Sequence, residues 1–445
     1  MFGTSGIRGP VGDTVTAGLA LDLGRALAES ANTVVVGRDA RDSGRALADA
    51  LAAGLQECGT DVVDLGRAST PAVARAVAVR DADAGVAVTA SHNPPEDNGL
   101  KFWTPSGQAF STAQQDAIEA ILEAEDYDLA AWDDHGTRTD WDGAVEGHRE
   151  ALVEAGGRAA DAAGVSLDDL SVVVDLGNGM GGVTADALFD LGADVETLNA
   201  QPDGRFPARP SEPTAETCAS LVRTVDALDA DLGIAHDGDA DRMMAVSDDA
   251  EFVPGDLLLA VFGRERAGEG ERVAAPVDTS LAVDDAVAEV GADVVRTRVG
   301  DVYVAERARE DDVAFGGEPS GAWIFPEETL CPDGPLAAVM LSVLAAAEPL
   351  STRLDRIDTY PIRRETVETD RKAALMETVT ERVTERYDDV STLDGVRVGT
   401  DDGWFLIRPS GTQPIVRLTA EAREAEQADA LLAAARDLVA DARED

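Results

Sequence analysis

Three aspartates at alternate positions are the first candidates for a chemical site. Asp237, Asp239 and Asp241 occur in "HDGDADR" and are separated only by Gly238 and Ala240. In an extended loop, alternate residues point to the same side, so the three carboxylates would lie close together. Carboxylates at such short distances repel one another unless a divalent cation lies between them. We therefore predict a Mg²⁺ site with coordination positions left open for a phosphate.

Two other interpretations of this loop are weaker. An EF-hand requires glycine at the sixth loop position, where this chain has Arg242, and the preceding letters "LGIA" indicate a strand. An acidic surface turn is the remaining alternative in a chain so rich in acids, although the small spacers and the preceding strand argue against it.

Ser91 is the second candidate, in "TASHNPPEDNGLKFW" (89–103), directly after the apolar run 85–88. A serine nucleophile needs a base within hydrogen-bond reach. His92 is adjacent, but neighbouring side chains tend to diverge, and the motif G-x-S-x-G is absent. His135 and His148 lie in a linker and in a polar helix. A serine hydrolase is therefore not favoured, and a phosphate carrier or a plain Asn-Pro turn stays open.

Two further loops carry polar groups suited to a phosphosugar. In "RPSGTQPIVR", glycine permits close approach of backbone amides, hydroxyls donate, and two arginines supply charge, which indicates a phosphate clamp. Its members are Arg408, Ser410, Gly411, Thr412 and Arg417. The alternative is a β-turn with incidental arginines. In "GGEPSGAW", Glu318 and Ser320 are suited to sugar hydroxyls, which is a weak signal alone. Together the four loops indicate phosphoryl transfer to and from a phosphosugar.

Composition limits the class of protein. The 445 residues carry a formal net charge of −49, spread along the chain, and only two lysines, Lys101 and Lys372. This charge disfavours nucleic acid and anionic membranes as partners and suggests adaptation to high salt. Three distant cysteines give no disulfide framework or zinc spacing. The opening letters lack signal-peptide features, and the apolar run 336–347 is too short for a bilayer. We expect a soluble, cytoplasmic protein.

The elements that must position these loops form a faint repeat. Short strands end at polar turns in 34–41, 172–182 and 273–280, and each is followed by a helix, a turn and another strand. An apolar run then ends in one of the loops 85–94, 232–242 and 313–321. Three α/β units of one design would each present a loop at the carboxyl end of a strand, where open sheets bind ligands. The alternative is that alternating strands and helices always look alike.

The remainder of the chain predicts a smaller α+β domain. It contains a strand–turn–strand pattern, "GWFLIRPSGTQPIVRLTAEA", and an amphipathic helix with Leu431, Leu432, Leu438 and Val439 on one face. The stretches 126–142, 247–256 and 347–356 are the predicted linkers. We predict domains at 1–143, 144–250, 251–350 and 351–445, which carry the serine, aspartate, recognition and clamp loops in that order.

In this order, the four loops resemble those of the α-D-phosphohexomutase superfamily over essentially the whole chain. The resemblance implies four domains around a central cleft: three topologically similar α/β domains with mixed sheets and an α+β C-terminal domain. It implies that Ser91 carries a phosphate and, with Asp237, Asp239 and Asp241, binds Mg²⁺. Glu318 and Ser320 would contact sugar hydroxyls, and the clamp residues would contact the distal phosphate.

The resemblance also implies roles for basic residues. "GTSGIRG" matches the family's opening, with Arg8 reaching the active site, and Lys101 falls where the family has its proposed general acid/base. A titratable lysine suits that role because arginine does not readily release a proton. We also include His92 among the candidate catalytic residues and Arg242 among the candidate substrate-binding residues.

Within the superfamily the motifs look most like archaeal phosphoglucosamine mutases. Ala322 stands where many relatives have histidine after "GGExSG", and Gln413 where glutamate is common. The expected activity interconverts hexose 6-phosphates and 1-phosphates, with glucosamine favoured, through phosphoserine and a 1,6-bisphosphate that also serves as activator. Alternatives are a phosphoglucomutase/phosphomannomutase, a phosphopentomutase, a silent sugar-phosphate-binding protein and a Mg²⁺-dependent phosphatase. We expect a phosphosugar as partner and a monomer or homodimer.

Overall fold

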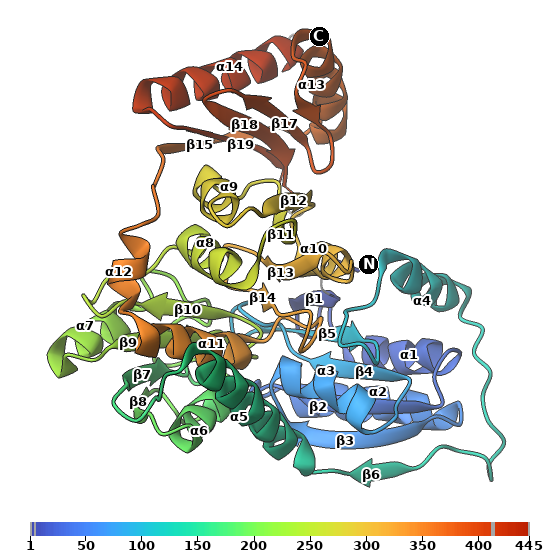
Figure 1. The fold of residues 1–445 in the computed structure, drawn as a ribbon. Coiled ribbons are helices and arrows are strands. Elements are labelled where there is room, and N and C mark those ends of the chain that lie inside the picture. Colours follow the sequence, from blue (N-terminus) through green and yellow to red (C-terminus); the bar gives the residue numbers. More distant parts are fainter. Residues whose placement is uncertain (1, 4–5, 411–413, 444–445) are drawn as a thin grey trace. The chain divides into compact units, whose positions relative to one another are not determined.

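The computed structural model describes residues 2–3, 6–410 and 414–443. The chain divides into two compact units, one comprising Met1–Leu258 with Pro319–Leu354 and the other Leu259–Glu318 with Asp355–Asp445. Figure 1 shows the helices and strands of both units, coloured along the sequence. Across the described part of the chain, no helix is both long and apolar enough to cross a membrane.

The first unit begins with a six-stranded mixed sheet in the order β1-β5-β4-β2-β3-β6. β2 pairs in parallel with β3 and β4, whereas β5 runs antiparallel to both of its neighbours. The elements of this region are β1 (Ile7–Pro10), α1 (Ala17–Ala28), β2 (Thr33–Arg38), α2 (Gly44–Glu57), β3 (Asp61–Arg67), α3 (Thr70–Val79), β4 (Ala84–Val88), β5 (Asp97–Trp103), α4 (Thr112–Ala124) and β6 (Arg138–Asp140).

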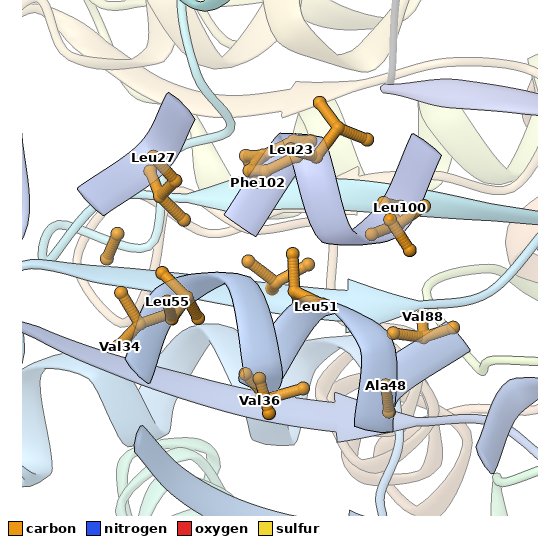
Figure 2. Close-up of a cluster of buried hydrophobic side chains, with 14 of the residues drawn as sticks. Leu23, Leu27, Val34, Val36, Ala48, Leu51, Leu55, Val88, Leu100 and Phe102 are labelled. Atoms are coloured by element: carbon orange, nitrogen blue, oxygen red, sulfur yellow. The ribbon is translucent and has the colours of Figure 1, made fainter. Parts of the chain in front are cut away.

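The central strands of this sheet are apolar on both faces. β2 reads TVVVGR and β4 reads AGVAV, without the polar alternation of a half-exposed strand, as expected for parallel strands between helical layers. On one face, Leu23 and Leu27 of α1 and Leu51 and Leu55 of α2 pack toward β2, β4 and β5 (Figure 2). Complete burial of each such leucine contributes about 1.5–3 kcal/mol to stability.

The second sheet of the first unit has the order β10-β9-β7-β8. β7 pairs in parallel with β8 and β9, and β10 runs antiparallel to β9. Its elements are α5 (Gly143–Ala163), β7 (Ser171–Asp175), α6 (Gly182–Asp190), β8 (Asp194–Leu198), α7 (Ala219–Leu228), β9 (Leu232–His236) and β10 (Met243–Val246). The same unit contains β14 (Trp323–Ile324), α11 (Gly334–Ala347) and α12 (Leu350–Leu354).

The second unit contains a parallel sheet and an antiparallel sheet. β11 pairs in parallel with β12 and β13. The helices and strands of this region are α8 (Gly255–Arg266), whose first residues belong to the first unit, β11 (Arg272–Pro276), α9 (Leu281–Ala288), β12 (Asp293–Thr297), α10 (Asp301–Ala308) and β13 (Val313–Gly317).

The C-terminal region forms a five-stranded sheet in the order β15-β19-β18-β17-β16, with antiparallel pairs throughout. Its elements are β15 (Ile362–Glu368), α13 (Lys372–Arg386), β16 (Val390–Ser391), β17 (Val396–Thr400), β18 (Gly403–Pro409), β19 (Ile415–Ala422) and α14 (Ala425–Arg443). Leu438 and Val439 of α14 are buried against this sheet, with Leu431 and Leu432 partly buried beside them. The two predicted strands and the amphipathic helix are therefore confirmed, and residues 411–413 between the strands lie outside the described residues.

The predicted repeat is confirmed by strand order. β2 lies between β3 and β4, β7 between β8 and β9, and β11 between β12 and β13. Each central strand is the first of its group in the chain, so the three α/β regions share one topology. The linker predicted at 126–142 contains a short edge strand, β6, whose residues are exposed and pair with β3. The four domain boundaries stay predictions.

Candidate active site

Ser91 lies in the turn after β4, at the carboxyl end of that strand. Its side chain is buried and its backbone adopts the left-handed conformation, with φ at 52°. This conformation costs a residue other than glycine roughly 1–2 kcal/mol. Ser91 Oγ donates a hydrogen bond to Asp237 Oδ2 over 2.6 Å and lies 3.4 Å from Asp241 Oδ1. The structure thus brings the candidate phosphate carrier to the aspartate loop.

The three aspartates lie in a tight turn between β9 and β10. The prediction that this loop is extended is therefore wrong. Ala240 is buried and left-handed, with φ at 59°, so the chain reverses within the motif. The reversal still gathers the carboxylates, because one oxygen atom from each of Asp237, Asp239 and Asp241 lies within 4.8 Å of the other two. All three side chains are buried.

Lys101 reaches the same cluster from β5. Its Nζ donates to Asp239 Oδ2 over 2.9 Å and forms an ion pair with Asp241. The residue is only 1% exposed, so this ammonium group balances carboxylate charge away from bulk water. Because β5 pairs with β4, which leads into the Ser91 turn, adjacent strands position the lysine and the serine.

The pKa values of two of the three carboxylates are shifted in opposite directions. Burial raises the pKa of Asp237 well above its usual value, and repulsion from Asp239 and Asp241 adds to the effect. Burial also opposes ionisation of Asp239, but attraction to Lys101 and a hydrogen bond from Thr70 outweigh it and hold the pKa of Asp239 below its usual value. The cluster therefore contains a readily protonated acid beside a firmly ionised one.

The aspartate cluster fits a divalent cation. Asp239 Oδ1 is buried and has no hydrogen-bond partner among the described residues. An unsatisfied buried acceptor costs about 1–3 kcal/mol, and a bound cation would satisfy it. Carboxylate oxygens are the ligands that Mg²⁺ prefers, and Mg²⁺ is commonly held by few carboxylates together with phosphate.

Three basic side chains border Ser91 and the aspartates. His92 Nδ1 lies 3.4 Å from Ser91 Oγ, so the expectation that these neighbours diverge is wrong at this left-handed turn. Burial, together with Arg242 and Arg8, lowers the pKa of His92 to about 2, which leaves the ring neutral at physiological pH. Arg8 lies on β1, paired with Gly99 of β5, and Arg242 N donates to Asp237 Oδ1 over 3.3 Å.

The recognition loop is divided between the two units. In the second unit, Glu318 Oε1 accepts a hydrogen bond from Gly300 N over 2.6 Å, at the start of α10. In the first unit, Ser320 is exposed, and Ala322 is buried and forms a bridge with Arg242 at the end of the aspartate loop. The second half of the recognition loop is therefore joined to the aspartate loop through its backbone.

The clamp residues lie in the second unit. Arg408 of β18 and Arg417 of β19 are direct cross-strand partners. Arg408 Nη1 also donates to Asp394 Oδ2 over 3.1 Å, and Lys372 bonds the backbone carbonyl of Ser410. Gly411, Thr412 and Gln413 lie outside the described residues.

Several residues at the site escaped the sequence analysis. Thr70, the first residue of α3, donates from Oγ1 to Asp239 Oδ2 over 2.6 Å. Buried Arg209 pairs with Asp175 and donates to the carbonyl of His236, which precedes the aspartate loop. Others are Arg41, Thr89 and Ser211, which bond the backbone of Ser91, and Asp39, which bonds Arg41 and Thr89. The available signal was polar residues at strand ends, as in "GRDAR", but side-chain direction was not readable from the letters.

Family comparisons agree with this geometry. The models described as phosphoglucomutase/phosphomannomutase α/β/α domains I, II and III match residues 1–128, 150–250 and 254–360, and that of the C-terminal domain matches 365–438. The chain belongs to the phosphoglucomutase/phosphomannomutase family, and its activity is that of a phosphomutase.

Curated relatives span nearly the whole chain. A protein of Methanopyrus kandleri named "Probable phosphoglucosamine mutase" is 48% identical, covering 96% of this chain and 95% of its own length. A protein of the same name from Methanococcoides burtonii is 44% identical, with 99% of each chain covered.

Solved structures share the fold. A phosphoglucomutase/phosphomannomutase family protein of Burkholderia thailandensis is 27% identical with a TM-score of 0.86, covering 100% of this chain and 98% of its own. The N-acetylphosphoglucosamine mutase of Aspergillus fumigatus, solved with GlcNAc-6P and magnesium, has a TM-score of 0.63 at 17% identity, covering 99% and 95%. The latter likeness concerns the fold alone.

Proposed function

We propose that this phosphomutase interconverts glucosamine 6-phosphate and glucosamine 1-phosphate, with Ser91 as the phosphoryl carrier. The choice of glucosamine is supported by the archaeal relatives, which bear that name at 41–48% identity over nearly their full lengths. The single observation that carries the chemistry is the 2.6 Å contact of Ser91 Oγ with Asp237 in a buried aspartate cluster.

In the first step, the sugar 1-hydroxyl of the 6-phosphate attacks phospho-Ser91. The O–P bond at Ser91 breaks, an O–P bond forms at the sugar, and the hydroxyl proton passes to a base. The neutral amine of Lys101 is proposed to accept that proton and to become the ammonium that pairs with Asp239 and Asp241 beside Ser91 Oγ. The product is a 1,6-bisphosphate and a free serine hydroxyl.

In the second step, the bisphosphate turns around and returns its other phosphoryl group to Ser91. The serine proton is released, a proton goes to the sugar oxygen, and glucosamine 1-phosphate remains. Asp237, Asp239 and Asp241 would hold a Mg²⁺ ion, which offsets charge on the transferring phosphoryl group when bound. Added 1,6-bisphosphate would serve as activator because it phosphorylates a free Ser91.

The clamp is proposed to bind the phosphate that is not being transferred. Arg408 and Arg417 are directly opposed across two strands, and like charges in such pairs favour a nearby anion; Asp394 contacts Arg408, and a phosphate would add further negative charge. Gly411 and Thr412 are assigned to the same clamp. For the other basic residues at Ser91, Arg8, His92 and Arg242, we propose contacts to the transferring phosphoryl group, and for Glu318 and Ser320 contacts to sugar hydroxyls.

A substrate panel tests the proposal. Glucosamine, glucose and mannose 6-phosphates and ribose 5-phosphate are assayed side by side with Mg²⁺ and a trace of the matching bisphosphate. We expect the highest kcat/KM for glucosamine 6-phosphate and almost no release of inorganic phosphate. A preference for glucose or mannose would contradict the substrate assignment alone. Stoichiometric phosphate release would indicate a phosphatase, and binding without turnover would indicate a silent sugar-phosphate-binding protein.

A further inference from the structure

All five side-chain N–H groups of Arg41 donate hydrogen bonds, either to the chain around Ser91 or to Asp39. Its guanidinium group is fully buried and has five N–H donors, the maximum for this side chain. Four of these N–H groups donate to backbone carbonyls between Ser91 and Asp97, the first residue of β5, and Nε donates to Asp39 Oδ2 over 3.0 Å. The four carbonyls belong to Ser91 (2.9 Å), Asn93 (2.6 Å), Pro94 (2.5 Å) and Asp97 (2.9 Å).

Asp39 and Thr89 extend this contact to the backbone amide of Ser91. Asp39 Oδ1 accepts from the backbone N of Arg41 over 2.9 Å, and its Oδ2 accepts from Thr89 Oγ1 over 2.7 Å. Thr89 Oγ1 in turn accepts from Ser91 N over 2.9 Å. The amide and the carbonyl of Ser91 are therefore both held, one through the threonine and the other directly by the arginine.

Ser91, the residue held by these hydrogen bonds, has a strained backbone conformation. Ser91 has φ at 52°, and such a conformation persists in a residue other than glycine only where its surroundings impose it. Released from these contacts, the turn would relax toward an ordinary conformation and carry Oγ away from Asp237. A displacement of about 1 Å at a reacting atom can reduce turnover by about a hundredfold.

We propose that Asp39, Arg41 and Thr89 form a brace, here called the Ser91 brace, that positions Ser91 for phosphoryl transfer. The proposal rests on the function proposed above. All three are positioning residues that act through the backbone of the turn. Removal of the brace therefore lowers the rate of transfer to and from Ser91 more than it lowers substrate affinity.

Thr89→Val tests the brace with little change of volume. It removes the hydroxyl between Asp39 and Ser91 N, whereas Thr89→Ser keeps it and provides the conservative rescue. Thr60→Val is the matched control, because Thr60 is also a buried threonine whose Oγ1 donates one hydrogen bond, to Ala31 O over 2.7 Å, in the same sheet region. Arg41→Lys is the second, independent variant, since an ammonium has three donors for the five acceptors that Arg41 serves.

Two rates are measured for each variant, together with the melting temperature. One is steady-state kcat and KM; the other is phosphorylation of Ser91 by the sugar 1,6-bisphosphate, followed by intact mass in a single turnover. We expect Thr89→Val and Arg41→Lys to lose about tenfold or more in both rates with KM nearly unchanged. Thr89→Ser should recover most of the loss, and Thr60→Val should show none of it.

Three results would overturn the brace. The first is that Thr89→Val and Arg41→Lys have the same two rates as the Thr60→Val control. The second is that the two rates of the variants fall only in proportion to the fraction of unfolded protein, while the folded fraction is fully active. A parent protein that neither turns over phosphosugars nor accepts a phosphoryl group would overturn the proposed function, and the brace with it.

Discussion

Ser91 and Asp237 are 146 positions apart in the chain, and their side chains meet at 2.6 Å. The contact joins the turn after β4 of the first sheet to the turn after β9 of the second, two turns at equivalent places in the repeated topology. Repetition of one α/β design therefore brings the hydroxyl of Ser91 and the carboxylates of the aspartate loop to one place.

Loss of the carrier hydroxyl should abolish turnover. In Ser91→Ala no oxygen remains to accept a phosphoryl group, so mutase activity should fall below detection while phosphosugar binding survives. Intact mass should show an added phosphoryl group on the parent after incubation with bisphosphate and none on the variant. Near-normal turnover by Ser91→Ala would contradict the phosphoserine mechanism.

Mg²⁺ should stabilise the folded protein through the aspartate cluster. A ligand that binds only the native state at a free concentration of 100 times its Kd adds about 2.7 kcal/mol to the free energy of unfolding. The melting temperature of the parent should therefore rise with Mg²⁺ and return after chelation. Asp239→Asn should lose most of this response, whereas Asp140→Asn, on the exposed edge strand β6, should keep it. An equal response in Asp239→Asn would exclude that residue as a ligand.

Gly238→Ala should impair transfer by separating the two turns. A Cβ at this position would lie 2.7 Å from Ser211 Oγ and 2.8 Å from the carbonyl oxygen of Ser91, closer than real Cβ contacts allow. We expect kcat to fall about tenfold or more, because the Ser91 turn must shift. Gly147→Ala is the control: nothing lies within 4 Å of a Cβ there, and the exposed helical site should gain about 0.5–1 kcal/mol of stability. Unchanged kcat in Gly238→Ala would show that the turn tolerates the displacement.

Asp333 should contribute to stability with a defined pH dependence. It is buried, bonds His148 Nε2 at 3.0 Å and Arg75 Nε at 3.1 Å, and caps α11. Burial opposes ionisation, but His148 and Arg75 outweigh it and lower the pKa of Asp333 in the folded state. A lowered folded pKa means that the stabilisation is present above the unfolded value, about 3.9, and is lost as pH falls through the folded pKa.

Asp333→Asn is therefore expected to cost about 3–5 kcal/mol in the free energy of unfolding at pH 7, as when one partner of a buried pair is removed. The difference from the parent, measured by urea unfolding, should shrink below about pH 4. Asp312→Asn, which removes an exposed partner of Arg272, should change stability little. A difference that stays constant from pH 7 to strongly acidic pH would contradict the assignment.

Salt should raise the stability of the whole molecule. The net charge of −49 causes self-repulsion that is screened over about 10 Å at 0.1 M salt and about 3 Å at 1 M. We expect the melting temperature to increase steadily with KCl. The control is a neutral osmolyte at a concentration that raises the melting temperature of an uncharged protein as much as KCl does. In this protein the osmolyte should raise the melting temperature less than KCl does. Stability that falls with KCl would contradict adaptation to high salt.

Much of this organisation was accessible from the letters. The apolar strands with polar turns at their ends predicted three α/β regions and placed Ser91 and the aspartates at ligand-binding ends of strands. The strict alternation of "DGDAD" predicted convergence of the carboxylates, although the path is a turn rather than an extended loop. The chain reverses at Ala240, which adopts a left-handed conformation. The sequence does not predict this conformation, because alanine has no preference for it.

The supporting contacts could not be predicted in the same way. Arg41 and Thr70 precede their partners by about 50 and 169 positions, and their role depends on how helices and strands pack rather than on spacing. Arg41 follows a strand-end aspartate, which made it visible as a polar residue. Its fivefold use of donors arises only when the Ser91 turn folds over it, a relation that no periodicity encodes.

The placement of α3 has an electrostatic consequence that no side chain carries. Its first residue, Thr70, donates from the backbone to Asp239 O over 2.9 Å and from the hydroxyl to Asp239 Oδ2, so the amino end of a ten-residue helix faces the aspartate loop. Aligned peptide dipoles give such an end a partial charge of roughly +0.5. This share of the positive potential at the aspartates belongs to the main chain, and it would persist through any substitution that leaves the helix intact.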